Sequence, residues 1–144
     1  MNLQKYSRRL LMRSDLQSVN KKAEAHREGF QTVAKIAALW KLSDHQLSVL
    51  LGLSSEDQLM ELKVASSGGN GSEFLNEDAL LRISQLLGIF KCLETLFENS
   101  DSADTWLSSP NGNHLFNGKP PIEVMLSDYN GIERVRGYLE HQCA

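Results

Sequence analysis

The chain has 144 residues, of which 41% are apolar and 23% charged, a length and composition typical of one globular domain or of two small ones packed together. Its apolar runs are too short for a transmembrane helix, and residues 1–16 lack the apolar core of a secretory signal, so we expect a cytoplasmic protein that contacts no membrane. Cys92 and Cys143 are far apart and have no CxxC spacing, which favours reduced thiols over a disulfide framework.

Charge is distributed unevenly along the chain. Residues 1–41 carry nine Lys or Arg against three acidic residues, a formal charge of +6, whereas the remaining residues carry six basic and fifteen acidic groups, a charge of −9. Such a division indicates an anionic partner for the basic part, for instance nucleic acid, about as often as it reflects a solvated surface. Both interpretations stay open at this point.

Residues 1–27 have little apolar surface and predict a basic N-terminal arm, either mobile or marginally helical. A sharper pattern begins at Glu28 and predicts a helix that ends near Lys41 or Leu42. The residues that recur on its apolar face are Phe30, Val33, Ala34, Ala37 and Trp40.

A second helix is predicted to follow at once. Ser43 and Gln46 have the spacing of a capping box, in which each side chain satisfies a free backbone N–H of the other residue. Gly52 is expected to end this helix in a left-handed conformation. Its apolar face consists of Leu47, Leu50 and Leu51.

A third helix is predicted from Ser54 or Ser55, with Leu59 and Leu62 facing inward. Three helices, the last two joined by a tight turn with glycine, are the plan of a helix-turn-helix domain, which we assign to residues 28–65. The candidate DNA contacts are Arg8, Arg9, Arg13, Ser55, Gln58 and Lys63. The third helix also carries acidic residues, which phosphate repels, so a helical bundle that never touches DNA is the better supported alternative.

The sequence SSGGNGS at residues 66–72 indicates a linker, which we place at residues 66–75. Asn76 is expected to cap a long helix that is apolar on most sides up to Phe97, which is typical of a central, buried helix. Cys92 is then most simply a small buried apolar residue of that helix. Residues 76–144 are assigned to a second helical unit, and the fold class expected for the chain is all-α.

Three shorter helices are predicted after the long one. Asp101 or Ser102 is expected to cap the first, which runs to about Leu107 and packs Trp106 on the long helix. An irregular loop follows, and the next helix extends from Pro121 to Leu126. Asn130 is expected to cap the last helix, whose apolar residues are Ile132, Val135 and Leu139.

The segment from Ala103 to Leu139 contains W-L-x-x-P-N…F-N-G-x-x-P-x-E-x-M-L, followed by G-I-E-R-V-x-x-Y-L. In residue order and spacing it resembles the C-terminal toxin-binding domain of Xre/MbcA/ParS-type antitoxins. The W-x-L-S and L-L-G-L-S sequences between Thr32 and Val64 also resemble the Xre-like N-terminal helix-turn-helix of that family.

The resemblance implies an all-helical, dimeric antitoxin of a type II toxin-antitoxin system. Such a protein binds a RES-domain toxin that consumes NAD, covers its active site and often binds its own operator. Family members commonly continue past the last helix, whereas this chain ends at Ala144, so we expect occlusion to rely on the last helix itself, unless the mode of inhibition differs. The candidate toxin-binding residues are Trp106, Leu107, Asn111, Phe116, Gly118, Pro120, Arg134, Arg136, Tyr138, Leu139 and His141.

Several of the candidate toxin-binding residues can also be explained by a structural role or by ordinary solvent exposure. Trp106, Leu107 and Phe116 are about twice as often core residues as interface residues, because burial is the default for apolar side chains. Asn111, Gly118 and Pro120 lie in the irregular loop, and glycine and proline at such positions commonly shape the backbone. Arg134 and Arg136 are more usually part of a solvated helix face.

Other classes of function find less support in the sequence. There is no GxSxG, P-loop, HExxH or dinucleotide fingerprint, and the four histidines have no metal-ligand spacing, so we expect a protein that is not an enzyme and uses no metal or cofactor. Two alternatives to the antitoxin stay open. One is a DNA-binding transcriptional regulator with no toxin partner, and the other is a helical dimerisation module with neither partner.

Overall fold

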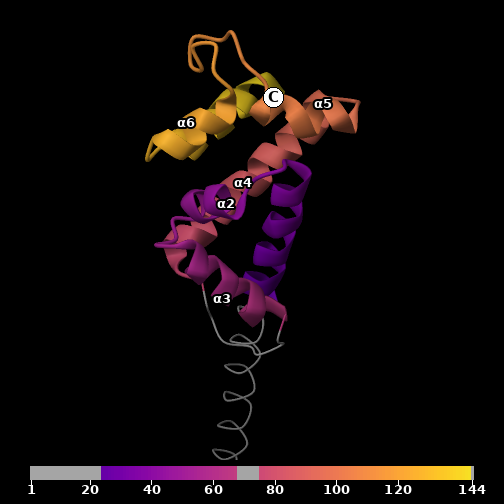
Figure 1. Cartoon of the computed structure of the whole chain (residues 1–144). Coiled ribbons are helices and arrows are strands. Elements are labelled where there is room, and N and C mark those ends of the chain that lie inside the picture. The colour runs from indigo at the N-terminus through magenta and orange to yellow at the C-terminus, as the bar shows by residue number, and fades with distance from the viewer. Residues whose placement is uncertain (1–23, 68–74, 144) are drawn as a thin grey trace, which may run out of the picture.

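The computed structural model describes residues 24–67 and 75–143, and every regular element in them is a helix, which confirms the all-α prediction. The arm predicted for residues 1–27 lies mostly outside the described residues, as does most of the linker predicted for residues 66–75. The elements, shown in Figure 1, are the helix of residues 24–39, α2 (Asp44–Leu50), α3 (Glu56–Ser67), α4 (Glu77–Leu96), α5 (Ser100–Thr105), the 3-10 helix η1 (Trp106–Ser108), α6 (Pro121–Ser127) and α7 (Gly131–Cys143).

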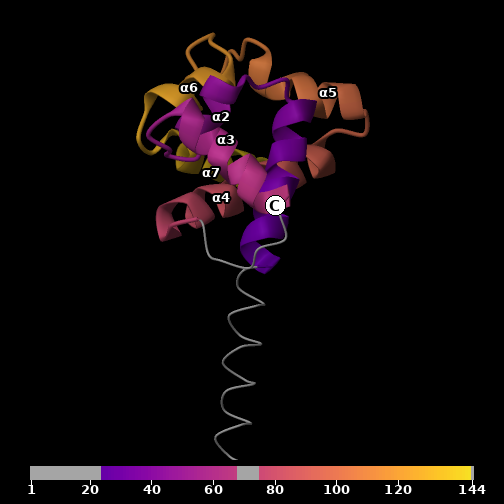
Figure 2. The same cartoon turned by 60° about the horizontal axis from the view of Figure 1, so that its bottom comes forward.

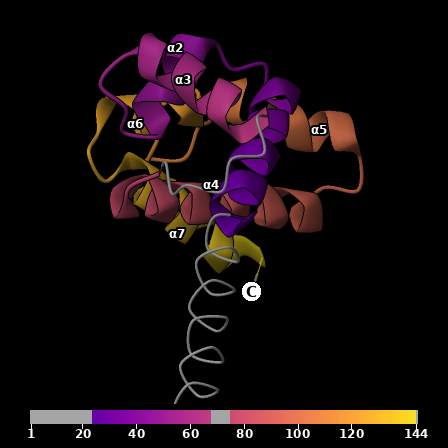
Figure 3. The ribbon, with the colours of Figure 1, turned by 90° about the horizontal axis from the view of Figure 1, so that it is seen from below.

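The long helix α4 is the centre of the fold. Figure 3 shows α2 and α3 on one side of α4, α7 on its other side and the helix of residues 24–39 crossing α4. Because α4 is covered from two sides, its apolar residues have to occupy more than one face, as the sequence predicts. Its buried residues are Ala79, Ile83, Leu86, Ile89, Cys92 and Leu93. Among the described helices none is long and apolar enough to cross a membrane.

The helices α4 and α7 lie side by side and run in the same direction. Near the start of both, the Arg82 guanidinium lies 5.9 Å from the centroid of the Tyr129 ring. Toward their other end, Sγ of Cys92 lies 2.8 Å from Sγ of Cys143. Between these contacts, a Cβ on Gly88 would lie 2.7 Å from Nε of Arg136, so glycine at this position leaves room for the guanidinium against α4.

The turn between α2 and α3 forms as predicted. Ser43 and Gln46 make the reciprocal hydrogen bonds of a capping box at the start of α2. Gly52 has a φ of +72°, and its N–H donates to the Val49 carbonyl at 3.0 Å, while the Leu53 N–H donates to the Ser48 carbonyl at 2.9 Å. This pair of bonds is a Schellman motif, which closes the helix and satisfies its last carbonyls.

The helix of residues 24–39 also ends in a Schellman motif, with Lys41 in the position that glycine usually occupies. Lys41 has a φ of 57°, its N–H donates to the Ala38 carbonyl at 3.1 Å, and the Leu42 N–H donates to the Ala37 carbonyl at 2.9 Å. A side chain in this left-handed conformation costs about 1 kcal/mol, because Cβ crowds the backbone. The sequence places the end of the helix correctly but does not indicate this backbone conformation.

The N-terminal helices pack directly on α4. The rings of Trp40 and Phe90 lie 6.4 Å apart, and Nη1 of Arg82 donates to the Leu50 carbonyl at 3.3 Å. Figure 2 shows α6 beside α2, so the two parts of the chain also meet away from α4. Buried apolar residues form one continuous core from Phe30 to Leu139. The division into units at residues 28–65 and 76–144 stays a prediction.

Two expectations about the segment after α4 are corrected by the structure. The cap of α5 is Asn99, whose Oδ1 accepts from the backbone N–H groups of Asp101 and Ser102 at 2.8 and 3.4 Å, so Asp101 and Ser102 are not the cap. The chain then tightens into η1 at Trp106, whereas the sequence predicts one continuous helix to Leu107. Asparagine is as good a cap as aspartate or serine, and it precedes them here.

Candidate functional site

Three aromatic rings from η1, the following loop and α7 meet beside the C-terminal helix. Trp106 stacks on Tyr138 with ring centroids 6.2 Å apart and planes inclined by 14°. Phe116 meets both rings by its edge, at 5.7 Å from Trp106 and 5.4 Å from Tyr138. Offset stacking and edge-to-face contact are the favourable geometries of aromatic pairs. The structure thus brings together three residues that the sequence singles out separately.

The loop of residues 109–120 is held closed by its own backbone. The Asn111 N–H donates to the Lys119 carbonyl at 3.2 Å, and the Gly118 N–H donates to the Asn111 carbonyl at 2.9 Å. The Asn111 side chain accepts from the Asn113 N–H at 2.9 Å. Asn117 and Gly118 have φ values of 54° and 82°, which reverse the chain. Asn111 and Gly118 therefore shape the loop that carries Phe116.

The outer side of α7 is accessible to solvent. Arg134, Tyr138 and His141 are spaced by four and three residues, so they share one helix face, opposite the buried Ile132, Val135 and Leu139. Arg134 and His141 are exposed, while Tyr138 is half-buried because it stacks on Trp106. We refer to Trp106, Arg134, Tyr138 and His141 as the α7 surface.

Other candidate residues lie beneath this surface or beside it. Leu107, Phe116 and Leu139 are each 1% exposed, so they support the surface from within the core, which confirms the plainer interpretation of Leu107 and Phe116. Pro120 is the half-buried residue before α6. Arg136 faces α4, where Nε donates to Glu140 Oε1 at 2.7 Å next to Gly88.

An ion pair fixes Arg134 at the start of α7. Its Nη1 donates to Oδ2 of Asp128 at 2.5 Å, and Oδ1 of the same carboxylate accepts from the Asn130 N–H at 3.1 Å. The hydrogen bond from Asn130 and then that from Arg134 lower the pKa of Asp128, so this carboxylate stays charged. Both partners are accessible to solvent, so the pair positions the guanidinium more than it stabilises the fold.

A groove lined in part by Phe116, which contacts Trp106 and Tyr138, is not apparent from the sequence. It has a volume of about 490 Å³ and lies between the loop and α6. Its walls combine apolar side chains with one lysine and one carboxylate, and they are formed by Leu115, Phe116, Asn117, Lys119, Glu123, Val124, Leu126 and Ser127. Helical periodicity cannot reveal this groove, because it arises only where the loop folds back against α6.

The structure describes three of the six residues that the sequence predicts as DNA contacts. Arg8, Arg9 and Arg13 lie outside the described residues. At the start of α3, Ser55 Oγ accepts from the Gln58 N–H at 3.2 Å, and Gln58 Oε1 accepts from the Ser54 N–H at 3.0 Å. These two side chains thus hold the start of α3.

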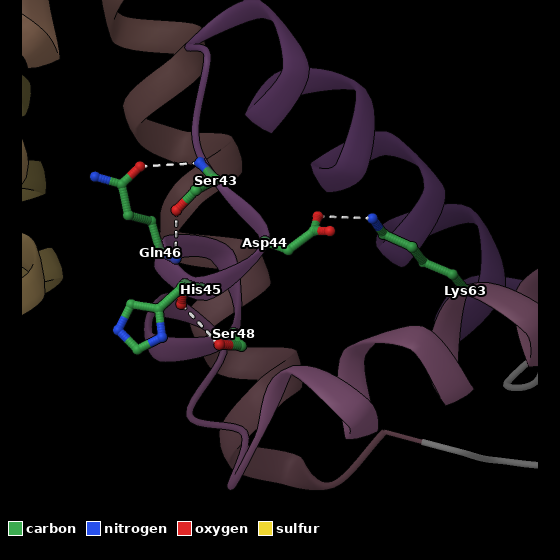
Figure 4. A network of polar contacts seen from close by, with 6 residues as sticks. All are labelled: Ser43, Asp44, His45, Gln46, Ser48 and Lys63. Carbon is green, nitrogen blue, oxygen red and sulfur yellow. Dashed lines mark hydrogen bonds and ion pairs between the residues drawn. The ribbon is translucent and has the colours of Figure 1, made fainter.

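Lys63 is also engaged within the fold. Figure 4 shows its Nζ reaching Oδ1 of Asp44 at the start of α2, at 2.9 Å, beside the capping box of Ser43 and Gln46. This pair joins the start of α2 to α3 and leaves the lysine partly exposed. Ser55 Oγ, Gln58 Oε1 and Lys63 Nζ thus have intramolecular partners.

Comparison with known proteins finds a matching family model and a relative. The antitoxin Xre/MbcA/ParS C-terminal toxin-binding domain matches residues 92–142, from the end of α4 through most of α7. The uncharacterised protein y4oB of Sinorhizobium fredii (strain NBRC 101917 / NGR234) is 35% identical over 109 residues, which cover 75% of this chain and 78% of that protein. No solved structure matches the chain significantly. The chain therefore belongs to the Xre/MbcA/ParS antitoxin family, with the toxin-binding domain of that family at residues 92–142.

Proposed function

We propose that this protein is the antitoxin of a type II toxin-antitoxin pair and that it neutralises a RES-domain, NAD-consuming toxin by covering the toxin's active site. In this proposal it acts in the cytoplasm, catalyses no reaction and needs no cofactor. The observation that carries the proposal is the α7 surface, since it lies inside the domain matched to toxin-binding antitoxins.

The chemistry of the α7 surface suits a protein partner. Tryptophan, tyrosine and arginine are the residues that most often dominate the binding energy of protein interfaces. The planar guanidinium of Arg134 can bind a carboxylate through two hydrogen bonds. The groove between the loop and α6 is linked to this surface through Phe116 and offers apolar walls to a side chain of the partner.

Two side chains of the α7 surface, those of Arg134 and Tyr138, are also held in place before any partner binds. Asp128 fixes Arg134 through an ion pair, and Trp106 fixes Tyr138 through stacking. Because these side chains are already ordered, binding a partner costs less conformational entropy, which favours affinity. The ion pair and the ring stack therefore support the surface as a binding site.

Charge reversal on the α7 surface tests the proposal. Arg134→Glu and His141→Glu are each expected to weaken the complex with the RES-domain toxin by about tenfold or more, because like charges oppose docking at an interface. Lys91→Glu is the matched control for Arg134→Glu, since Lys91 is an exposed lysine on α4 and the change in charge is the same. Isothermal titration with purified toxin measures the affinities. Equal affinities for all three variants would exclude this surface.

Repression of its own operon by a homodimer is a second candidate function. The observation that favours it is the closed turn at Gly52, which joins α2 to α3 in the order of a helix-turn-helix motif, together with the basic residues 1–41. The acidic start of α3 weighs against it, because phosphate repels carboxylates. A regulator with no toxin partner is the corresponding alternative to the antitoxin.

Salt dependence tests whether the chain binds DNA in this way. If the basic residues contact phosphates, affinity for upstream DNA has to fall steeply between low and physiological salt, since binding then releases counterions. An Arg8→Ala, Arg9→Ala, Arg13→Ala triple variant is expected to flatten that dependence. Binding that is absent, or that does not respond to salt, would count against any role in repression.

A further inference from the structure

The two cysteines of the chain meet where α7 ends against α4. Cys92 is 7% exposed on α4, and its Sγ lies 2.8 Å from that of Cys143, in hydrogen-bond contact. Both thiols are free, and Cys143 is only half-buried. The sequence predicts reduced thiols from their wide separation, but it cannot show that the fold brings them together.

We propose that Cys92 and Cys143 are a reversible disulfide site that ties the end of α7 to α4 when small-molecule disulfides accumulate. A disulfide needs its sulfur atoms about 2.05 Å apart, so the pair has to close by less than about 1 Å. The two sulfurs already touch, and they lie on helices that pack against each other. This inference does not depend on the identity of the toxin.

The reaction balances as two thiol-disulfide exchanges. The more accessible Cys143 first attacks a small-molecule disulfide, for example oxidised glutathione, forms a mixed disulfide and releases one small thiol. Cys92 then attacks Sγ of Cys143 and releases the second small thiol. Two protein thiols are oxidised to one disulfide, and one small-molecule disulfide is reduced to two thiols.

The surroundings of Cys92 decide the rate of the second step. Burial raises the pKa of Cys92 to about 11, and the hydrogen bond and charge of Cys143 and the charge of Glu140 act in the same direction, while Arg136 opposes them. These charged and titratable groups all face Cys92 from α7. The thiolate is the nucleophile, so at neutral pH only a small fraction of Cys92 can attack.

A bond at this position would act on the part of α7 that leads to His141. It would join residues 51 positions apart and prevent the last turn of α7 from separating from α4. Disulfides in the cytosol of ordinary cells are mostly transient and often sense redox conditions. The thiol pair therefore fits a redox-responsive tie better than a permanent crosslink.

Mass spectrometry of the full-length folded protein, treated with oxidised glutathione, tests the proposal. The parent protein is expected to lose two hydrogens and to yield a linked peptide containing Cys92 and Cys143, which dithiothreitol separates. Cys92→Ala should accumulate the glutathione adduct at Cys143. Cys143→Ala should stay unmodified, since Cys92 is buried. From the isolated mixed disulfide, raising the pH by one unit should speed ring closure about tenfold.

Three results would overturn the proposal. The first is a stable glutathione adduct on the parent protein with no linked peptide. The second is a disulfide between two chains instead of within one. The third is a Cys143→Ala variant that reacts as fast as Cys92→Ala. Circular dichroism of each variant confirms that it is folded, and Cys143→Ser replaces Cys143→Ala if the latter is not.

Discussion

The two glycines of α7 differ in what surrounds them. A Cβ on Gly131 would overlap the Val124 carbonyl oxygen and lie 2.9 Å from Cα of Met125, both in the backbone of α6. A Cβ on Gly137 would meet nothing within 4 Å. Gly131 therefore sets how closely α6 and α7 approach each other, while Gly137 has no such role.

Alanine substitutions separate these two positions. Gly131→Ala is expected to lower the free energy of unfolding by about 2–3 kcal/mol, because the backbone of α6 has to move away. Gly137→Ala should raise it by about 0.5–1 kcal/mol, since alanine favours an exposed helix interior. Urea unfolding followed by circular dichroism measures both. Similar effects of the two substitutions would refute the close packing at Gly131.

Asp128 provides a test of the ion pair at the start of α7. Its pKa is lowered first by the Asn130 N–H and then by Arg134. Arg134→Gln is expected to raise the pKa of Asp128 only part of the way to its ordinary value, because the backbone hydrogen bond remains. Carbon-detected NMR titration measures the shift. An unchanged pKa, or a complete return to the ordinary value, would contradict this order of causes.

The lowered pKa of Asp128 also predicts how the stability of the fold changes with pH. Because the pKa of Asp128 is lower in the folded than in the unfolded protein, its contribution to stability is present above the unfolded pKa. That contribution is lost as pH falls through the folded pKa. Arg134→Gln should therefore make stability less sensitive to acid in this range.

At the scale of elements, helix ends divide into those that the sequence reveals and those that it does not. The capping box at Ser43 and the stop at Gly52 follow from residue type, because hydroxyl side chains cap helices and glycine accepts a positive φ. The left-handed Lys41 does not, since lysine rarely adopts this conformation. The surrounding fold fixes the backbone of Lys41 against its intrinsic preference.

This difference predicts opposite effects of two substitutions. Lys41→Gly should raise the free energy of unfolding by about 0.5–1 kcal/mol, since glycine accepts the same backbone without crowding. Gly52→Ala should lower it, because its Cβ would lie 2.9 Å from Asp78 Oδ2 and the backbone would be strained at a φ of +72°. Thermal unfolding compares the two variants with the parent chain. A destabilised Lys41→Gly would show that the lysine side chain contributes more than its conformation costs.

At the scale of the whole molecule, the apolar pattern identifies most of the core but not its arrangement. The predicted inward residues of α7, including Val135 and Leu139, are buried, and α4 is apolar on several sides because two layers cover it. Periodicity cannot show that α7 runs in the same direction as α4. It also cannot show that Trp106 turns toward Tyr138, since both depend on how distant segments pack.

The residues of the candidate site can also be predicted in part from the sequence, but their arrangement cannot. Trp106, Phe116 and Tyr138 could be selected from the sequence, and the structure joins them in one cluster. The structure also separates Arg134, on the exposed face of α7, from Arg136, which faces α4. Only the fold makes this distinction, because the two arginines lie on different faces of one helix.

Co-expression of this chain with its proposed partner, a RES-domain toxin sought among the products of the neighbouring genes, tests the central claim most directly. The proposed function predicts that the two proteins co-purify as one complex in size-exclusion chromatography. It also predicts that cells expressing the toxin regain growth and their NAD level when this chain is present. Separate elution of the two proteins, with growth arrest and NAD loss unchanged by this chain, would contradict its role as the antitoxin.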